Sequence, residues 1–334
     1  MIDFRSDTVT RPDASMRKAM ASAEVGDDVF ADDPTVNELE TRVAEIMGHQ
    51  SALMVPSGTQ SNLIALLTHC GRGEEYIVGQ EYHTYYYEAG GAASLGGIQP
   101  QPIAVENDGT LDLNTVKKWI KPDDYHFART RLLSLENTHS GKVISNDYLG
   151  KAIHLAKVHN LSVHLDGARV FNAAVAQQID VQEITRPFDS VSVCFSKGLG
   201  APVGSVLCGS EEFIARARRW RKMVGGGMRQ AGILAAAMHY ALDYHVDRLA
   251  LDHQNAQLLQ NELSKIDELK VEPANTNMLY IEFADEDIAQ RVQQALEQQH
   301  ILIASGKRVR LVTHLDIDEA DVRAFVDALK KLLK

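Results

Sequence analysis

The sequence feature that most limits the fold is a buried strand that ends at a lysine. Val191, Val193 and Phe195 alternate with smaller residues, which predicts a strand, and Lys197 then opens a turn with three glycines in seven residues. Open α/β sheets bind their ligands at the carboxyl ends of their strands, so a lysine at this point favours covalent chemistry. A surface lysine that simply opens a glycine-rich turn is the alternative interpretation.

Strand patterns alternate with helical patterns over most of the chain. A second apolar segment begins at Leu161 and ends at Asp166, 31 residues before Lys197. Further strands are expected over 51–55, 75–79, 132–136 and 203–209, and helices over 35–48, 109–120, 148–159 and 211–220. This alternation predicts an α/β protein with a mostly parallel, doubly wound sheet.

The C-terminal part of the sequence has a different pattern. A long helix is expected over 243–266, followed by strands within 271–283, 301–304 and 309–312 and helices over 287–299 and 318–333. This predicts a large domain with an N-terminal arm over residues 1–245 and a small α+β domain over 246–334.

Composition and charge exclude several classes of protein. With 34 basic and 45 acidic residues the net charge is −11, which disfavours a nucleic-acid partner. Three scattered cysteines make no disulfide framework, and no apolar run approaches the roughly 20 residues of a membrane span, so we expect a soluble cytoplasmic protein. The acidic loop 24–34 does not match a calcium-binding pattern, so helix caps are expected there and no metal site.

Two further segments carry candidate binding residues. The strand 51–55 runs through Ser57, Gly58 and Thr59 straight into a helix, which directs free backbone N–H groups at one point and suits an anion. An ordinary helix cap is the alternative, and neither a Walker nor a dinucleotide pattern is present. His83 lies among tyrosines before a glycine-rich turn, where aromatic faces stack on a ring; for Tyr87 both core packing and function stay open.

An aspartate and a lysine at two strand ends are the pair that pyridoxal phosphate (PLP) requires, one for its ring nitrogen and one for a Schiff base. Eight motifs in order then complete a known pattern, and the chain closely resembles the low-specificity L-threonine aldolases, which are fold-type-I PLP enzymes with the aspartate-aminotransferase architecture. The motifs are Arg5-Ser-Asp-Thr-Val-Thr10, Gly26-Asp-Asp-Val-Phe30, Asp33-Pro-Thr-Val-Asn37, Pro56-Ser-Gly-Thr59, Leu135-Glu-Asn-Thr-His139, Leu165-Asp-Gly-Ala-Arg169, Ser196-Lys-Gly-Leu-Gly200 and Arg310-Leu-Val-Thr-His314.

The resemblance implies a role for each matching residue around the cofactor. Lys197 would form the Schiff base, Asp166 would keep the pyridine nitrogen protonated, and His83 would stack on the ring, with Ala168 on the opposite face. The expected phosphate-binding residues are Gly58, Thr59, Arg229 from a neighbouring subunit, and Lys222.

The resemblance also implies a substrate site. Ser6, Arg169 and Arg310 would bind the substrate carboxylate, although Arg308 lies on the same strand face as Arg310. His126 would lie near the substrate side chain, and Tyr87 occupies a position where the family also has Phe. His83, His126 or a water between them is the expected base for the β-hydroxyl group.

The reaction expected from the resemblance is that of a carbon–carbon lyase. It would cleave L-threonine and L-allo-threonine reversibly to glycine and acetaldehyde, in a homotetramer built from dimers with shared active sites. An aminotransferase or β-eliminating lyase on the same fold is one alternative, and a catalytically silent PLP-binding scaffold is another.

Overall fold

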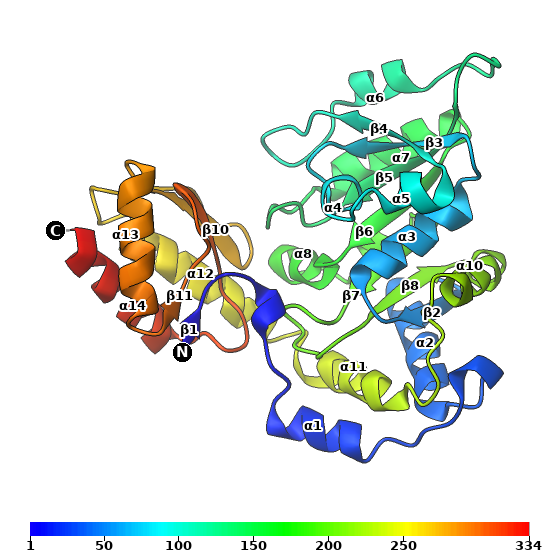
Figure 1. The fold of residues 1–334 in the computed structure, drawn as a ribbon. Coiled ribbons are helices and arrows are strands. Elements are labelled where there is room, and N and C mark those ends of the chain that lie inside the picture. The colour runs from blue at the N-terminus through cyan, green and yellow to red at the C-terminus, as the bar shows by residue number, and fades with distance from the viewer. Residues whose placement is uncertain (334) are drawn as a thin grey trace.

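The computed structural model describes residues 1–333, and its largest feature is a seven-stranded sheet in the order β2-β8-β7-β6-β5-β3-β4 (Figure 1). Six strands run in one direction, and only β8 is antiparallel to its two neighbours. The predicted mostly parallel sheet is therefore confirmed. The strands are β2 (Ser51–Val55), β3 (Glu74–Gly79), β4 (Gln99–Ile103), β5 (Arg129–Glu136), β6 (Ser162–Gly167), β7 (Ser190–Cys194) and β8 (Ser205–Gly209).

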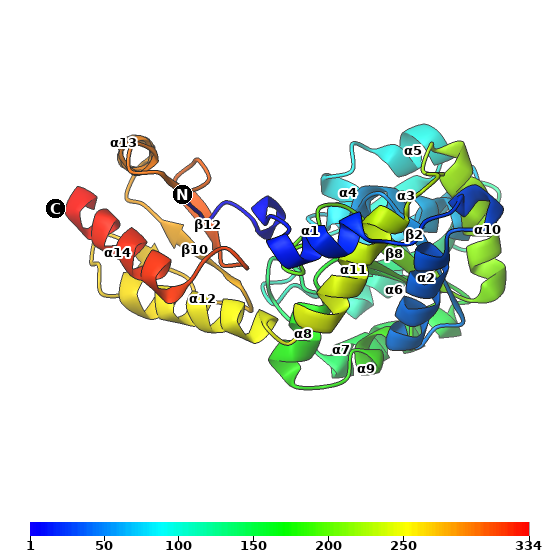
Figure 2. The ribbon, with the colours of Figure 1, turned by 90° about the horizontal axis from the view of Figure 1, so that it is seen from below.

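Helices cover both faces of this sheet, as Figure 2 shows. Alternate residues of β2 illustrate why, because Leu53 and Val55 pack in one apolar cluster with α3 (Gly58–His69) and α10 (Glu211–Met223), whereas Met54 packs in another with α2 (Pro34–Met47). The other helices of this part are η1 (Asp7–Val9), α1 (Ala14–Ala21), η2 (Asp28–Phe30), α4 (His83–Tyr86), α5 (Gly91–Gly96), α6 (Leu113–Trp119), α7 (Asn146–Val158), α8 (Val170–Gln177), α9 (Gln182–Thr185) and α11 (Gly232–Tyr244).

The C-terminal part has its own core and its own sheet. Strands β9 (Lys270–Val271), β10 (Met278–Glu282) and β12 (Arg308–Val312) form an antiparallel sheet in the order β12-β10-β9, covered by α12 (Leu249–Leu263), α13 (Glu286–Glu297) and α14 (Glu319–Leu333). None of the helices in the described range is long and apolar enough to cross a membrane.

The N-terminal arm completes this second core. Strand β1 (Ile2–Asp3) pairs in parallel with β11 (Ile301–Leu302), and the fully buried Phe4 packs against Phe325 of α14. The arm was expected to belong with the large domain, whereas its apolar side chains pack with C-terminal residues. The division near residue 245 stays a prediction.

The predicted helix over 243–266 is interrupted in the structure. α11 ends at Tyr244, four turn residues follow, and α12 starts at Leu249. The buried ring of His245 explains the break, because its Nδ1 lies 2.7 Å from the carbonyl oxygen of Leu199 and holds the chain against the turn after Lys197. Helical periodicity continues through the break, so the sequence pattern alone does not show it.

Other elements also differ from the sequence-based prediction, and two of these differences have a local cause. The helix expected from residue 109 starts only at Leu113, because Asp112 caps it by accepting from the backbone N–H groups of Asn114 and Thr115. Strand β4 was not predicted, since its sequence is Gln-Pro-Gln-Pro-Ile. As an edge strand it needs hydrogen bonds on one side only, which is where prolines are tolerated.

Candidate active site

The parallel strands deliver their functional residues to one edge of the sheet. Asp166 is the last residue but one of β6, and Lys197 follows the neighbouring β7 by three residues. His83 follows β3 and begins α4, and Ser57 and Gly58 follow β2. All these strands point the same way, so the structure brings the predicted lysine, aspartate, histidine and anion site to the same edge.

Asp166 belongs to a buried polar cluster that includes two residues outside the sequence-based prediction. The Nδ2 of Asn62 donates to Oδ2 of Asp166 and to Oε1 of Glu88, both over 2.8 Å. The other oxygen of Asp166 accepts from the backbone N–H of Ala168 at 3.1 Å. Asn62, Glu88 and Asp166 are all buried, so the amide of Asn62 ties together two carboxyl groups that are shielded from water.

His83 joins the same cluster from the solvent side. Its Nδ1 lies 2.9 Å from Oε1 of Glu88, and its backbone N–H donates to Glu136. The hydrogen bond to Glu88 raises the pKa of His83, against the opposing effect of burial. Burial also raises the pKa of Glu88, to about 7, and the charge of Asp166 adds to this rise. The positive charge of Lys197 opposes this rise in the pKa of His83.

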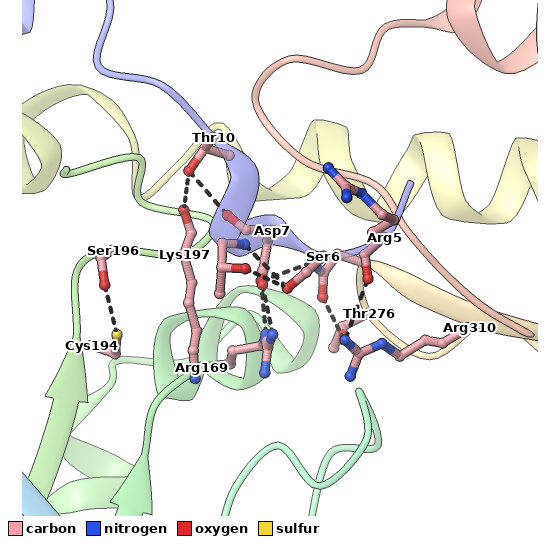
Figure 3. Close-up of polar contacts among 12 residues, drawn as sticks. Arg5, Ser6, Asp7, Thr10, Arg169, Cys194, Ser196, Lys197, Thr276 and Arg310 are labelled. Carbon is pink, nitrogen blue, oxygen red and sulfur yellow. Dashed lines mark hydrogen bonds and ion pairs between the residues drawn. The ribbon is translucent and has the colours of Figure 1, made fainter. Parts of the chain in front are cut away.

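A second cluster joins the N-terminal arm to the loop after β6 (Figure 3). Asp7 is fully buried and accepts from Nε and Nη2 of Arg169 at 2.7 and 2.6 Å, and Asn277 donates to it at 3.3 Å. Burial alone would raise the pKa of Asp7, but the adjacent guanidinium outweighs it and holds that pKa well below its ordinary value. Thr10 donates to the carbonyl oxygen of Lys197, so the arm also contacts the lysine turn.

Beside these clusters lies a cavity of about 430 Å³ that opens between the large sheet and β10 and β12. Four predicted site residues line it: His83, Tyr87, Arg169 and Arg310. The cavity has a polar lining, because Glu81, Glu136, His139 and Arg308 also contribute to it.

The structure distinguishes the two arginines of β12. The guanidinium of Arg308 lies over the ring of Tyr280 and makes two hydrogen bonds to Glu272, at 2.6 and 2.9 Å. Arg310 makes one long contact, 3.4 Å from the carbonyl oxygen of Arg5, which is visible in Figure 3. Arg310 therefore keeps most of its donors available to the cavity, whereas those of Arg308 are engaged.

The expected anion site has the geometry of a helix start. Ser57 caps α3 through the backbone N–H of Gln60, and a side chain at Gly58 would come within 3.6 Å of Ser205 Oγ. That hydroxyl is buried without a hydrogen-bond partner among the described residues. Free N–H groups and an unpartnered hydroxyl fit a phosphate here, and the buried carboxylate of Asp166 fits a pyridinium nitrogen, so the residues present suit PLP.

Other predicted residues lie further out. His126 is exposed on the loop before β5, where its ring contacts Asp124 at 2.6 Å, and it does not line the cavity. Lys222 and Arg229 are exposed, and Arg229 pairs with Asp27 at 3.1 Å. Within one chain the structure therefore does not bring these three residues to the site.

Ser6, Ala168 and Tyr87 lie close to the other groups. Ser6 caps the short helix η1 that carries Asp7, and Ala168 lies between Asp166 and Arg169. The ring of Tyr87 is 5.6 Å from that of His83 and largely exposed. Their roles stay predictions.

Sequence reasoning missed Asp7, Asn62 and Glu88 as site residues. Asp7 lies inside the matched Arg5-Ser-Asp-Thr motif, which was the available signal for it. Asn62 lies one turn into the helix that begins at the expected anion site, and nothing in its surroundings indicated a contact with Asp166, 104 residues away.

Comparison with known proteins defines the class to which this fold and this site belong. A family model described as beta-eliminating lyase matches residues 3–286, so the chain belongs to the beta-eliminating lyase family. Among its relatives, the low specificity L-threonine aldolase of Escherichia coli (strain K12) is 55% identical over 317 residues, which cover 95% of each chain. The probable low-specificity L-threonine aldolase 2 of Arabidopsis thaliana is 44% identical over 343 residues, which cover 99% of this chain and 97% of that one. The resemblance to the L-threonine aldolases is thus confirmed.

Solved structures confirm the fold. The threonine aldolase of Leishmania major superposes over the full length of both chains with a TM-score of 0.85 at 20% identity. A serine palmitoyltransferase from S. paucimobilis, whose structure holds a PLP adduct, covers 99% of this chain and 87% of its own with a TM-score of 0.78 at 16% identity. The chain therefore has the predicted fold-type-I architecture.

Proposed function

We propose that this protein is a PLP-dependent carbon–carbon lyase that cleaves L-threonine, L-allo-threonine and related L-β-hydroxy-α-amino acids to glycine and an aldehyde such as acetaldehyde. The observation that carries the proposal is the delivery of Lys197, Asp166 and His83 to one edge of the sheet, beside a cavity that holds Arg310. The 55% identity to an L-threonine aldolase over nearly the whole chain supports it.

Residues on both sides of the cavity orient the substrate. Arg169, Arg310 and Ser6 bind the α-carboxylate; the first is fixed by two hydrogen bonds to Asp7, and the second has its donors free. Lys197 supplies the amine that holds the cofactor, and the start of α3 with Gly58 and Thr59 holds its phosphate. When bound, PLP supplies a sink for the electron pair left on Cα when the Cα–Cβ bond breaks.

The chain's own residues move the protons. A base on the His83 side of the cavity takes the β-hydroxyl proton as the aldehyde leaves, and a proton returned to Cα completes glycine. His83 or a water that it holds is better placed for this than His126, since His83 lines the cavity and His126 does not.

Product analysis tests the proposal directly. The purified protein loaded with PLP and given L-threonine should release acetaldehyde and glycine in equal amounts, and Lys197→Ala should abolish both the visible absorbance band and the activity. Formation of a keto acid without acetaldehyde would instead show an aminotransferase or a β-eliminating lyase. A protein that binds PLP through Lys197 but converts no amino acid would be a scaffold.

We further propose that the active enzyme is a cytoplasmic homotetramer of dimers. Arg229 is exposed and pairs with Asp27 in its own chain, which supports its delivery to the phosphate of a neighbouring chain.

A further inference from the structure

The cluster around Asp166 continues along one face of the sheet, between α3 and strands β6 and β7, as a chain of hydrogen bonds. His164, fully buried in β6, places its Nε2 3.2 Å from Oδ1 of Asn62 and its Nδ1 2.8 Å from the hydroxyl of Ser190. The same hydroxyl lies 2.7 Å from Nε2 of His69. Five side chains between α3 and the sheet therefore lead to His83, with a branch to Asp166 at Asn62: His69, Ser190, His164, Asn62 and Glu88.

The chemistry of the groups fixes the direction of these bonds. An ionised Asp166 only accepts, so the Nδ2 of Asn62 must face it and the Oδ1 of Asn62 must face His164. His164 then carries its proton on Nε2. Burial lowers the pKa of His164 to about 4, so the ring is neutral, its Nδ1 accepts from Ser190, and Ser190 accepts from His69.

At the His83 end of this chain of hydrogen bonds, the donors and acceptors can be assigned in the same way. Oε1 of Glu88 already accepts from Asn62, and it lies 2.9 Å from Nδ1 of His83. With the Glu88 carboxylate as acceptor, Nδ1 of His83 carries a proton, and Nε2 is left as the ring nitrogen for the cavity. The Nδ2 of Asn62 donates to both Glu88 and Asp166, which accounts for the close approach of these two carboxyl groups.

We propose that Glu88 is a positioning residue, held by Asn62, that keeps the proton of His83 on Nδ1 and so presents Nε2 to the substrate as an acceptor. This inference deepens the proposed function and rests on it for the identity of the substrate. Glu88 itself does not line the cavity, so it acts through His83.

Charged and titratable groups on the neighbouring elements surround His83 and Glu88 and influence their pKa values. Asp166 of β6 and Lys197 after β7 have opposite effects on His83, and the phenol of Tyr76 in β3 is close enough to Glu88 to be affected by its charge. Glu136 at the end of β5 accepts from the backbone N–H of His83 and from Nδ1 of His139. Of these groups, only Glu88 contacts the ring of His83 through a hydrogen bond.

The test observes His83 in the cofactor-free protein, by nitrogen-15 NMR of labelled histidine with His83→Asn to assign its signals. The neutral ring should carry its proton on Nδ1. Glu88→Gln keeps an acceptor but removes the charge, so the midpoint of the His83 titration should move to lower pH. Glu88→Ala removes the acceptor, and the preference for Nδ1–H should be lost. Circular dichroism confirms that each variant is folded.

Glu81→Gln is the matched control, because Glu81 lines the same cavity but makes no side-chain hydrogen bond to His83. It should leave the His83 signals unchanged. In the PLP-loaded enzyme, Glu88→Gln should move the pH limb of kcat/KM that His83 controls in the same direction. The proposal fails if His83 carries its proton on Nε2, or if the Glu88 variants leave its titration unchanged. Either result would leave the lyase activity of the wild-type protein intact.

Discussion

At the scale of single residues, the balance of charge in the cavity depends on two arginines with different partners. Asp7 neutralises Arg169 through two short hydrogen bonds and fixes its direction, whereas Arg310 contacts only a carbonyl oxygen. The net positive charge that attracts a substrate carboxylate therefore comes mainly from Arg310.

Replacing Arg310 should weaken substrate binding selectively. Arg310→Ala removes a charge-assisted hydrogen bond worth about 1.5–3 kcal/mol, so we expect KM for L-threonine to rise by roughly 10- to 100-fold while PLP affinity changes little. Steady-state kinetics and a PLP titration measure the two effects. Arg308→Ala should have a smaller effect, because its guanidinium is engaged by Glu272 and Tyr280. A larger effect at Arg308 would reverse the assignment.

The raised pKa of Glu88 predicts a pH dependence of stability. Burial raises this pKa to about 7 in the folded protein, so the protonated carboxyl favours folding at low pH and that contribution is lost as the pH rises through 7. Glu88→Gln does not titrate. The stability of Glu88→Gln minus that of the wild type should therefore increase from pH 5 to pH 8 by about 1–3 kcal/mol. The difference between the two melting temperatures should increase accordingly. Calorimetry of the cofactor-free proteins measures this difference; a constant difference would contradict it.

These residues also show what a sequence can and cannot reveal. Lys197 and Asp166 were predictable because each ends an apolar strand, and parallel strands bring their ends together. Asn62 and Glu88 were not, because their roles depend on hydrogen bonds between side chains from different elements. Local periodicity carries no information about such contacts.

At the scale of elements, a substitution in the turn that leads into β8 can show how tightly α11 packs on the sheet. Gly204 has a φ of +107°, and a Cβ there would collide with Met238 of α11. Gly204→Ala should destabilise the protein by about 2–4 kcal/mol, from backbone strain and overpacking together. Gly73→Ala, with a φ of +80° and no neighbour within 4 Å, should cost only about 1 kcal/mol. Denaturation in urea compares the two, and equal losses would show that packing contributes nothing.

The elements themselves were predictable where periodicity was strong. β2, β6 and β7 lie within a few residues of their expected positions, as do α2, α7 and α10, whereas α8 and α9 between β6 and β7 were not predicted. β4 and the break between α11 and α12 were missed. The first is stabilised by pairing with β3 rather than by its own propensity, and the second by a contact from His245 to Leu199.

At the scale of the whole molecule, the position of Arg229 makes a prediction about subunits. If a neighbouring chain supplies Arg229, then Lys197→Ala and Arg229→Ala remove residues from different chains of one site. Mixing the two inactive proteins under conditions that exchange subunits should restore about a quarter of the wild-type activity, because half of the random dimers carry one intact site out of two. Light scattering measures the oligomeric state. No recovery in confirmed mixed oligomers would place Arg229 outside the shared site.

The contacts of the N-terminal arm determine the order in which parts of this chain can fold during translation. Its first strand pairs with residues 301 and 302, and Phe4 packs on Phe325, so residues 2–4 have no partner until residues about 300 positions further along the chain emerge. The large sheet is translated long before that. Ser6 and Asp7 therefore gain the support of this packed arm only after residue 325 has emerged, whereas Lys197 and Asp166 belong to strands that are translated earlier.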